Sequence, residues 1–564
     1  MKIVTVRRIC QIFFLTLFFW FCITSTLGIN WWQLRGWPVN WFLELDPLVG
    51  ISTLIATGTI YKGLIWGVGT VILTLVFGRF FCGWLCPFGA LHQFIGFLGR
   101  FGSKISRAQL ARLNQYRPAQ AIKYAILIFF ISSSIAAHLL KTTPLLITGL
   151  LDPIPFVYRL VNLTILPFID NMFLHLSPNP RFYDGAWIIG ALGTTALLLN
   201  LWIPRFYCRY ICPLGALLGW ISTISFWQIG KKISPCTRCL KCQFNCEGAC
   251  EPMDAIRISE CVMCMNCLDQ CEFLTYQAES SRGEMQSFNK KEAFSLDKTR
   301  QHAIPDKISH KTVPDISHKT VPDISHKTMP DISHKTMPDI SRRTFVASVV
   351  SGAAIIPMMS LNGTTGNNWN PDLIRPPGAL PESQFLSRCV KCGQCIRICP
   401  TNVIQPADIL TGGFEGLWTP ALNFRIGSSG CQLHCIACGN VCPTGAILPL
   451  NLDQRAGINN YAQKGPIRIG TAFVDQGRCL PWAMNRPCIV CQETCPVSPK
   501  AIMISQVVVT VNNVKVELQR PFIDPSRCIG CGVCEHECPV RGKRAIRVTA
   551  ENESRSRDHV LVGK

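Results

Sequence analysis

Cysteine spacing constrains this chain more than any other feature. Of its 31 cysteines, most recur in runs of the form Cys-x2-Cys-x2-Cys-x3-Cys. A disulfide scaffold is typical of short secreted chains and does not explain such runs. The spacing is that of 4Fe–4S ligands, in which three cysteines wrap one cluster and a fourth, followed by proline, reaches a neighbouring cluster. Zinc would explain isolated Cys-x2-Cys pairs but not triple cysteines that end in Cys-Pro. The sequence therefore predicts about six 4Fe–4S clusters.

The runs pair into three units of two clusters each, and within a unit the fourth ligands are expected to be exchanged between clusters. The first unit assigns one cluster to Cys236, Cys239, Cys242 and Cys271, and the other to Cys261, Cys264, Cys267 and Cys246. The second unit comprises Cys389, Cys392, Cys395 and Cys399 with Cys431, Cys435, Cys438 and Cys442. The third comprises Cys479, Cys488, Cys491 and Cys495 with Cys528, Cys531, Cys534 and Cys538.

The first unit departs from the pattern, because neither Cys246 nor Cys271 precedes proline. Cys250, in the sequence CEGAC, is an alternative to Cys246 as the ligand. In the third unit the wide gap between Cys479 and Cys488 indicates an insertion in the first loop.

A membrane domain of four spans is expected over residues 1–230. Charged residues make up only 16% of the chain, and apolar stretches at 9–29, within 52–78, at 121–140 and at 186–203 are long enough to cross a bilayer. Lys and Arg gather in the loops on one side, which places the N-terminus and the segment after residue 204 in the cytoplasm. The same distribution explains the net charge of +21 without nucleic-acid binding. The proline-rich stretch 143–170 is expected to be interfacial or re-entrant.

The membrane domain contains two near copies of one motif, RFFCGWLCPFGAL at 79–91 and RFYCRYICPLGAL at 205–217. They indicate two duplicated helical hairpins. The motifs leave three roles open for their cysteines: a cluster held by four converging thiolates, redox-active disulfides or structural packing. These cysteines are Cys82, Cys86, Cys208 and Cys212. Cys10 and Cys22, in the first span, are expected to be packing residues.

A Leu-Asp-Pro sequence precedes each copy, with the acids at Asp46 and Asp152. Asp followed by Pro is typical of a helix start. The alternative is that one of these carboxylates accepts a proton from quinol, because carboxylates within membranes often form proton relays. His92 and His138 are weaker candidates for the same role.

A linker is expected over residues 273–340, followed by an export signal at 341–361. The linker contains an eight-residue repeat and is interpreted as a spacer, with metal binding by His310, His318, His326 and His334 as the alternative. Arg342 and Arg343 stand before Phe345 and an apolar run, as in twin-arginine signals, which export folded proteins. No clear cleavage site follows, so a fifth membrane anchor is expected.

The remaining segments are expected to be α+β ferredoxin-like domains: a cytoplasmic two-cluster domain at 231–272 and a four-cluster domain at 375–550. The sequence has no Cys-x2-Cys-His, no Gly-x-Gly-x-x-Gly fingerprint and no Walker loop. Attached c-type haem and a bound nucleotide are therefore not expected.

These residues resemble two protein families joined in one chain. Residues 1–272, with their spans and paired Cys-x3-Cys-Pro motifs, resemble the NapH-type membrane ferredoxins. Residues 341–550 resemble the NapG or MauM-type ferredoxins, on RPPGALPE (375–382), CVKCGQCIRICPTNVIQP (389–406), GLWTP (416–420), CLPWAMNRPCIVCQETCPVSPKAI (479–502) and CIGCGVCEHECPV (528–540).

The resemblance implies a quinol dehydrogenase component of the bacterial cytoplasmic membrane. Quinol from the membrane pool would be oxidised, and electrons would leave through a periplasmic four-cluster domain to a reductase or cytochrome c. Three alternatives stay open: a maturation or regulatory ferredoxin for a metalloenzyme, electron flow in reverse towards quinone, and a non-enzymatic scaffold. The quinone type, the terminal acceptor and the oligomeric state are also open.

Overall fold

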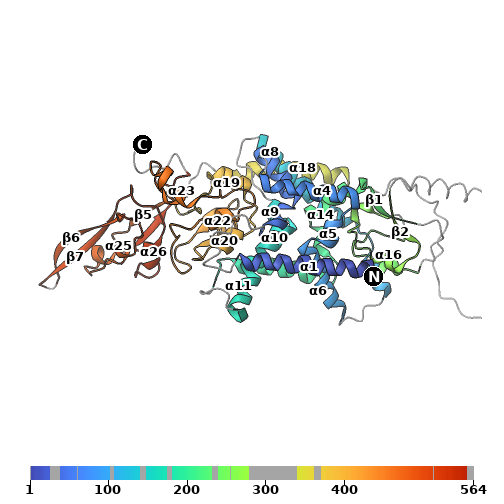
Figure 1. Cartoon of the computed structure of the whole chain (residues 1–564), viewed down its shortest axis with the longest axis horizontal. Helices are drawn as coiled ribbons and strands as arrows, with labels where there is room; N and C mark the ends of the chain where they lie inside the picture. Colours follow the sequence, from blue (N-terminus) through green and yellow to red (C-terminus); the bar gives the residue numbers. More distant parts are fainter. Residues whose placement is uncertain are drawn as a thin grey trace, which may run out of the picture.

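The computed structural model describes residues 2–25, 39–59, 61–101, 107–139, 148–174, 181–231, 239–253, 256–278, 340–360, 370–511 and 513–555. These residues form an elongated molecule of three parts (Figure 1). A helical region (residues 3–224) lies in the middle, with a small Cys-rich domain (residues 227–278) at one end and a large Cys-rich domain (residues 370–555) at the other. The repeat linker and Cys236 lie outside the described residues.

The helical region repeats one pattern of helices twice. The first copy contains α1 (Ile3–Thr24), α2 (Trp41–Glu44), α3 (Pro47–Thr57), η1 (Lys62–Ile65), α4 (Trp66–Phe77), α5 (Phe80–Trp84) and α6 (Pro87–Phe101). The second contains α7 (Arg107–Leu113), η2 (Pro118–Ala121), α8 (Ile122–Leu139), α9 (Thr148–Leu151), α10 (Pro153–Leu160), η3 (Val161–Ile165), α11 (Leu166–Ile169), η4 (Asp170–Leu174), α12 (Ala186–Leu198), η5 (Leu199–Leu201), α13 (Phe206–Tyr210), α14 (Pro213–Ile221) and η6 (Ser222–Ile224). In both copies Asp-Pro begins a helix, and each Cys-x3-Cys-Pro motif joins a one-turn helix to a longer one.

Two helices in the described part of the chain are long and apolar enough to cross a bilayer, Ile3–Thr24 and Gln109–Leu139. The stretch expected to hold the second span is divided into α3 and α4, because Gly58 ends α3 with a φ of 66°. The fourth expected span corresponds to a shorter apolar helix, Ala186–Leu201.

Of the stretch 143–170, expected to be interfacial or re-entrant, residues 148–151 and the part from Pro153 onward are helical, and the second helix continues to Leu174. Pro153 and Pro155 lie in the first turn, where a missing N–H costs nothing. Pro167 follows a π-helical turn, η3, which accommodates a proline in the helix interior. The helix therefore continues through all three prolines, although so many prolines in a short stretch suggest that it would be broken.

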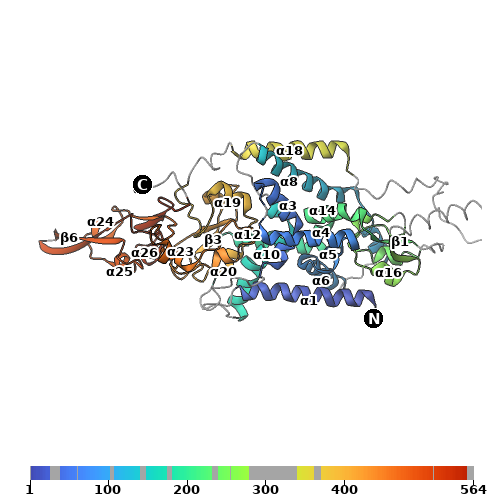
Figure 2. The same cartoon turned by 45° about the horizontal axis from the view of Figure 1, so that its top comes forward.

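Helix α18 (Arg342–Ser360) begins at the paired arginines and runs alongside α8 (Figure 2). Gly352 allows this close approach, because a Cβ there would clash with Ser132 and with the backbone of Phe129. The segment expected to be an export signal is thus packed against the helical region.

Short strand pairs and one-turn helices build both Cys-rich domains. In the small domain β1 (Trp227–Lys231) pairs antiparallel with β2 (Leu274–Ala278), and between them lie α15 (Lys241–Phe244), η7 (Ile258–Glu260) and α16 (Asn266–Gln270). This strand pair extends the domain beyond the expected limits of 231 and 272.

Three antiparallel strand pairs organise the large domain. They are β3 (Ile404–Pro406) with β4 (Pro420–Leu422), β5 (Thr471–Val474) with β8 (Ile546–Thr549), and β6 (Ile502–Val511) with β7 (Val514–Ile523). The helices are α19 (Glu382–Arg388), α20 (Gln394–Ile398), α21 (Ile409–Gly412), α22 (Ala437–Asn440), α23 (Leu452–Ala456), η9 (Asn459–Tyr461), α24 (Leu480–Ala483), α25 (Val490–Glu493) and α26 (Val533–Glu537). Cysteines form much of the buried core of this domain.

Candidate iron–sulfur centres and the core between them

The large domain gathers its cysteines into four sets of four. In each set three cysteines of one run lie beside the last cysteine of the paired run, which is the arrangement that an exchange of fourth ligands requires. The sets are Cys389, Cys392, Cys395 and Cys442; Cys431, Cys435, Cys438 and Cys399; Cys479, Cys488, Cys491 and Cys538; and Cys528, Cys531, Cys534 and Cys495.

Three of these sets wall a cavity. These are the cavities of the Cys442, Cys538 and Cys495 sets, and the rest of each wall is largely apolar. Four thiols around a compact, dry space fit a 4Fe–4S cluster. No three His, Cys, Asp or Glu side chains of the described residues converge on the position of a single ion. The sets instead frame a larger space.

Backbone N–H groups in the cluster loops point at the cysteine sulfurs. The N–H of Lys391 donates to Cys389 and that of Gln394 donates to Cys392. Gly393 supports the second loop turn with a φ of 76°, which favours glycine. Such hydrogen bonds to sulfur are one of the determinants of cluster potential.

The four sets follow one another in a row. Cys395 of the first set neighbours Cys438 of the second. The N–H of Cys431 donates to the carbonyl of Cys531 at 2.7 Å, which joins the second set to the set of Cys528, Cys531, Cys534 and Cys495. Cys534 of that set neighbours Cys491 of the last. The four cysteine sets therefore form a row that begins next to the helical region and runs away from it.

The small domain brings together Cys246, Cys261, Cys264 and Cys267. Cys250 lies in the same place, with its Sγ 3.3 Å from that of Cys246. Both alternatives for the fourth ligand are therefore at the site. Of the other expected set, Cys242 is buried, Cys271 is half-buried and Cys239 is exposed.

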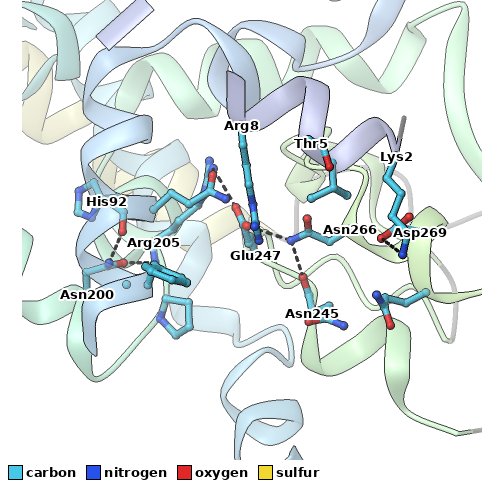
Figure 3. Close-up of a pocket in the computed structure, with 16 residues that line it drawn as sticks. Lys2, Thr5, Arg8, His92, Asn200, Arg205, Asn245, Glu247, Asn266 and Asp269 are labelled. Carbon is cyan, nitrogen blue, oxygen red and sulfur yellow. Dashed lines mark hydrogen bonds and ion pairs between the residues drawn. The ribbon is translucent and has the colours of Figure 1, made fainter. Parts of the chain in front are cut away.

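Glu247 anchors the small domain to the helical region. Its carboxylate pairs with Arg205 at 2.9 Å and with Arg7 at 3.4 Å. Burial opposes ionisation, but Arg205 and Arg7 outweigh it and lower the pKa of Glu247 to about 2. Beside this contact a polar cleft of about 280 Å³ lies between α1, α6 and the small domain (Figure 3). Arg8 and Asn266 line it, and neither was singled out from the sequence.

The first cluster loop of the large domain lies directly on the other end of the helical region. Arg159, fully buried, donates to the carbonyl of Lys391 at 3.1 Å and to that of Gly149 at 3.2 Å. Asn162 donates to Gln394 at 3.0 Å. Asn40 donates to the carbonyl of Val441, next to Cys442, at 2.7 Å. The helical region and this cysteine set therefore share a buried polar interface.

Asp46 and Asp152 meet inside the helical region, although they are 106 residues apart in the sequence. Both are fully buried, and their carboxyl groups are within hydrogen-bonding reach of each other. Asp46 also accepts from the N–H of Leu48 at 3.0 Å, which is the helix-capping role expected of it. Two neighbouring carboxylates would repel each other if both were ionised, so a pair of this kind is suited to taking up a proton.

The two histidines considered with these acids lie elsewhere. The His92 ring is fully buried, has no hydrogen-bond partner among the described residues, and packs against Phe88 and Tyr207. His138 is exposed at the end of α8. Cys22 is buried in the helical core and Cys10 is half-buried, as expected of packing residues.

Two family models match the chain. A model described as a 4Fe-4S binding domain matches residues 59–106 and 183–232, which include the two Cys-x3-Cys-Pro motifs. A model described as a 4Fe-4S dicluster domain matches residues 388–446 and 455–541, which hold the cysteine sets of the large domain. No solved structure matches the chain.

The chain is similar to ferredoxin-type proteins and to an electron transport protein. The methylamine utilization ferredoxin-type protein MauM of Methylophilus methylotrophus is 33% identical over 184 residues, 31% of this chain and 70% of the relative. The ferredoxin-type protein NapG of Escherichia coli (strain K12) is 34% identical over 176 residues, 31% of this chain and 69% of the relative. The putative electron transport protein YccM of the same organism is 27% identical over 238 residues, 41% of this chain and 60% of the relative. Over about a third of its length, this chain therefore belongs to the family of ferredoxin-type iron–sulfur proteins that includes MauM and NapG.

Proposed function

We propose that this protein is a membrane-bound electron carrier that oxidises quinol and passes the electrons through its large domain to a periplasmic reductase or cytochrome. The observation that carries the proposal is the buried interface between the helical region and the Cys389–Cys395 loop. It holds the first cysteine set of the large domain next to the core that contains Asp46 and Asp152. Bound 4Fe–4S clusters would supply one-electron carriers.

Quinol oxidation releases two protons with two electrons, and iron–sulfur clusters take up only electrons. A proton acceptor close to the first electron acceptor is therefore needed. The Asp46–Asp152 pair suits this role, because both side chains are buried and neither forms an ion pair with another described residue. Tyr207 donates to the carbonyl of Leu151, the neighbour of Asp152, and so fixes this loop.

The membrane position rests on the two long apolar helices and on the arrangement of the domains. The described parts of the Lys- and Arg-rich segments contact the small domain, through α7 and through Arg205, and the positive-inside rule assigns that side to the cytoplasm. The large domain lies at the opposite end of the helical region (Figure 1) and would then face the periplasm, after export signalled by Arg342 and Arg343.

The test uses the whole chain, purified anaerobically in detergent and oxidised. Addition of a menaquinol analogue should bleach the visible iron–sulfur absorbance promptly. If quinol does not bleach it but dithionite does, the clusters are intact and the donor is not quinol. That result would overturn the proposal and favour flow towards quinone or a maturation role.

A further inference from the structure

The two Cys-x3-Cys-Pro motifs are not used by the six expected clusters, yet the structure brings them together. Cys82 and Cys86 come from the α5–α6 junction, and Cys208 and Cys212 from the equivalent α13–α14 junction. All four are free thiols, and they lie close enough to one another to interact electrostatically. Each repeat supplies only two of the four ligands that a 4Fe–4S cluster needs.

The second cysteine of each motif stands at the start of a helix. The Sγ of Cys212 accepts the N–H of Gly215 at 3.1 Å, in the first turn of α14. Cys86 accepts the corresponding N–H of Gly89, in the first turn of α6. The N-terminal ends of two helices thus face the same group of thiols, and helix N-termini favour sulfur in its anionic form.

Two arginines cross from one repeat to the other at this place. Arg205, which precedes the second motif, donates to the carbonyl of Cys82 at 3.4 Å. Arg79, which precedes the first, reaches the loop of Cys212 and Gly215. Both side chains are buried, and the Nε of each has no hydrogen-bond partner among the described residues.

The buried charges around these thiols do not balance. Arg205 is paired with Glu247, and Lys123 is paired with Glu260. The guanidinium of Arg79 donates to the carbonyl of Ser259 at 3.0 Å, and the carboxylate near it, that of Glu260, is already paired with Lys123. One carboxylate thus serves two buried cations, and a buried cation is costly without an anion of its own. Four neutral thiols would not provide one, whereas a 4Fe–4S cluster with four thiolate ligands is an anion.

Glycine stands at the same closely packed position of both motifs. A Cβ at Gly89 would lie 2.8 Å from the carbonyl oxygen of Cys82, and one at Gly215 would lie 3.1 Å from the Sγ of Cys212 and 2.9 Å from Arg79. In both repeats the absence of a side chain at this glycine therefore lets neighbouring groups pack closely around the motif cysteines.

The thiol group also lies against a cluster loop of the small domain. Trp84, within the first motif, donates to the carbonyl of Met263 at 3.0 Å, between Cys261 and Cys264. Arg209, within the second motif, donates to the carbonyl of Cys246 at 3.2 Å. Tyr207, next to Cys208, contacts the carbonyl of Leu151 on the side of the acid pair.

We infer that Cys82, Cys86, Cys208 and Cys212 together hold one further 4Fe–4S cluster, shared between the two repeats. The family model that matches each repeat does not say that the two repeats share a cluster. We infer the sharing because each repeat supplies two thiols and because Arg79 and Arg205 each reach the other repeat. The inference rests on the proposed role as an iron–sulfur carrier but does not depend on quinol as the donor.

The test counts iron and acid-labile sulfide per chain in the full-length protein, purified anaerobically. C82S and C208S should each lose the iron and sulfide of one cluster, and the C82S/C208S double variant should lose no more than either single variant. C22S removes a buried thiol outside the motifs and should keep the full content. The electron paramagnetic resonance signals of the other clusters, if retained, establish that a variant is folded.

Three results would overturn the inference. They are full iron content in both single variants, a double variant that loses twice the iron of a single one, and motif cysteines found as disulfides by mass spectrometry of the anaerobic protein. R79Q provides a milder probe, because removal of a buried positive charge should lower the reduction potential of one resonance signal without loss of iron. If quinol does not reduce the wild-type protein but C82S still loses one cluster, quinol is rejected as the electron donor and the cluster site proposed here stands.

Discussion

The side chain of Asn162, in the helical region, donates a 3.0 Å hydrogen bond to the side chain of Gln394, between two cysteines of the large domain. Gln394 is fully buried and in turn donates to Asn40 at 3.2 Å and to the carbonyl of Val39 at 3.3 Å. A buried amide with its partners in place fixes both sides of an interface. This contact therefore sets the position of the first cysteine set, whatever the length of the preceding linker.

Replacement of Asn162 by alanine should loosen this interface. The Oε1 of Gln394 would lose its donor while buried, which costs about 1–3 kcal/mol. Hydrogen–deuterium exchange of residues 390–398 should become faster by a corresponding factor. N459A removes a hydrogen bond from an exposed Asn in the same domain and serves as the control. Unchanged exchange in N162A would show that the interface does not depend on this pair.

The acid pair predicts a specific kinetic defect. D46N and D152N should each slow bleaching by menaquinol roughly a hundredfold, the range of a lost proton acceptor, with dithionite reduction unchanged. D408N is the matched control, because Asp408 also caps a helix, by accepting from the N–H of Thr411 at 2.7 Å, but lies far along the chain in the large domain. Stopped-flow absorbance measures all three. Wild-type rates in both D46N and D152N would reject the proton-acceptor role and leave Asp46 with its capping role alone.

Glu382 should make the large domain sensitive to acid. Burial opposes its ionisation, but Arg375 and Arg555 outweigh it and lower the pKa to about 2. Because an unfolded glutamate titrates near about 4.3, the ionised group stabilises the fold above that pH and loses its contribution as pH falls towards 2. The difference in thermal midpoint between wild type and E382Q should thus be largest near neutral pH and shrink below about pH 4.5.

The control for the pH series is E493Q, which changes an exposed carboxylate. Its thermal midpoint should follow that of the wild type at every pH. A gap between wild type and E382Q that stays constant down to pH 3 would mean that Glu382 acts by packing rather than by charge.

The sequence predicted the local chemistry better than the path of the chain. Cysteine spacing is a local property, so the grouping of Cys389, Cys392 and Cys395 with Cys442 followed from the pattern alone. The division of residues 47–77 at Gly58 was missed, since hydropathy averages over a turn of helix. Two other features depend on how the two repeats face each other, which the sequence of one repeat does not show. They are the crossing of Arg79 and Arg205 and the contact of Asp46 with Asp152.

The exchange of fourth ligands within the second unit gives the sharpest test of the cysteine assignments. In the structure Cys442 lies beside Cys395, whereas Cys399 lies beside Cys438, which is the arrangement expected if the fourth ligands are exchanged. A C395S/C442S double variant should therefore lose the iron of one cluster, whereas C438S/C442S should lose that of two. Iron analysis on anaerobic full-length protein distinguishes the two variants, and the reverse result would mean that each run binds its own cluster without exchange. Loss of both clusters in C395S/C442S and C438S/C442S alike would mean that the two clusters of the unit assemble only together, and the variants would then not support exchange.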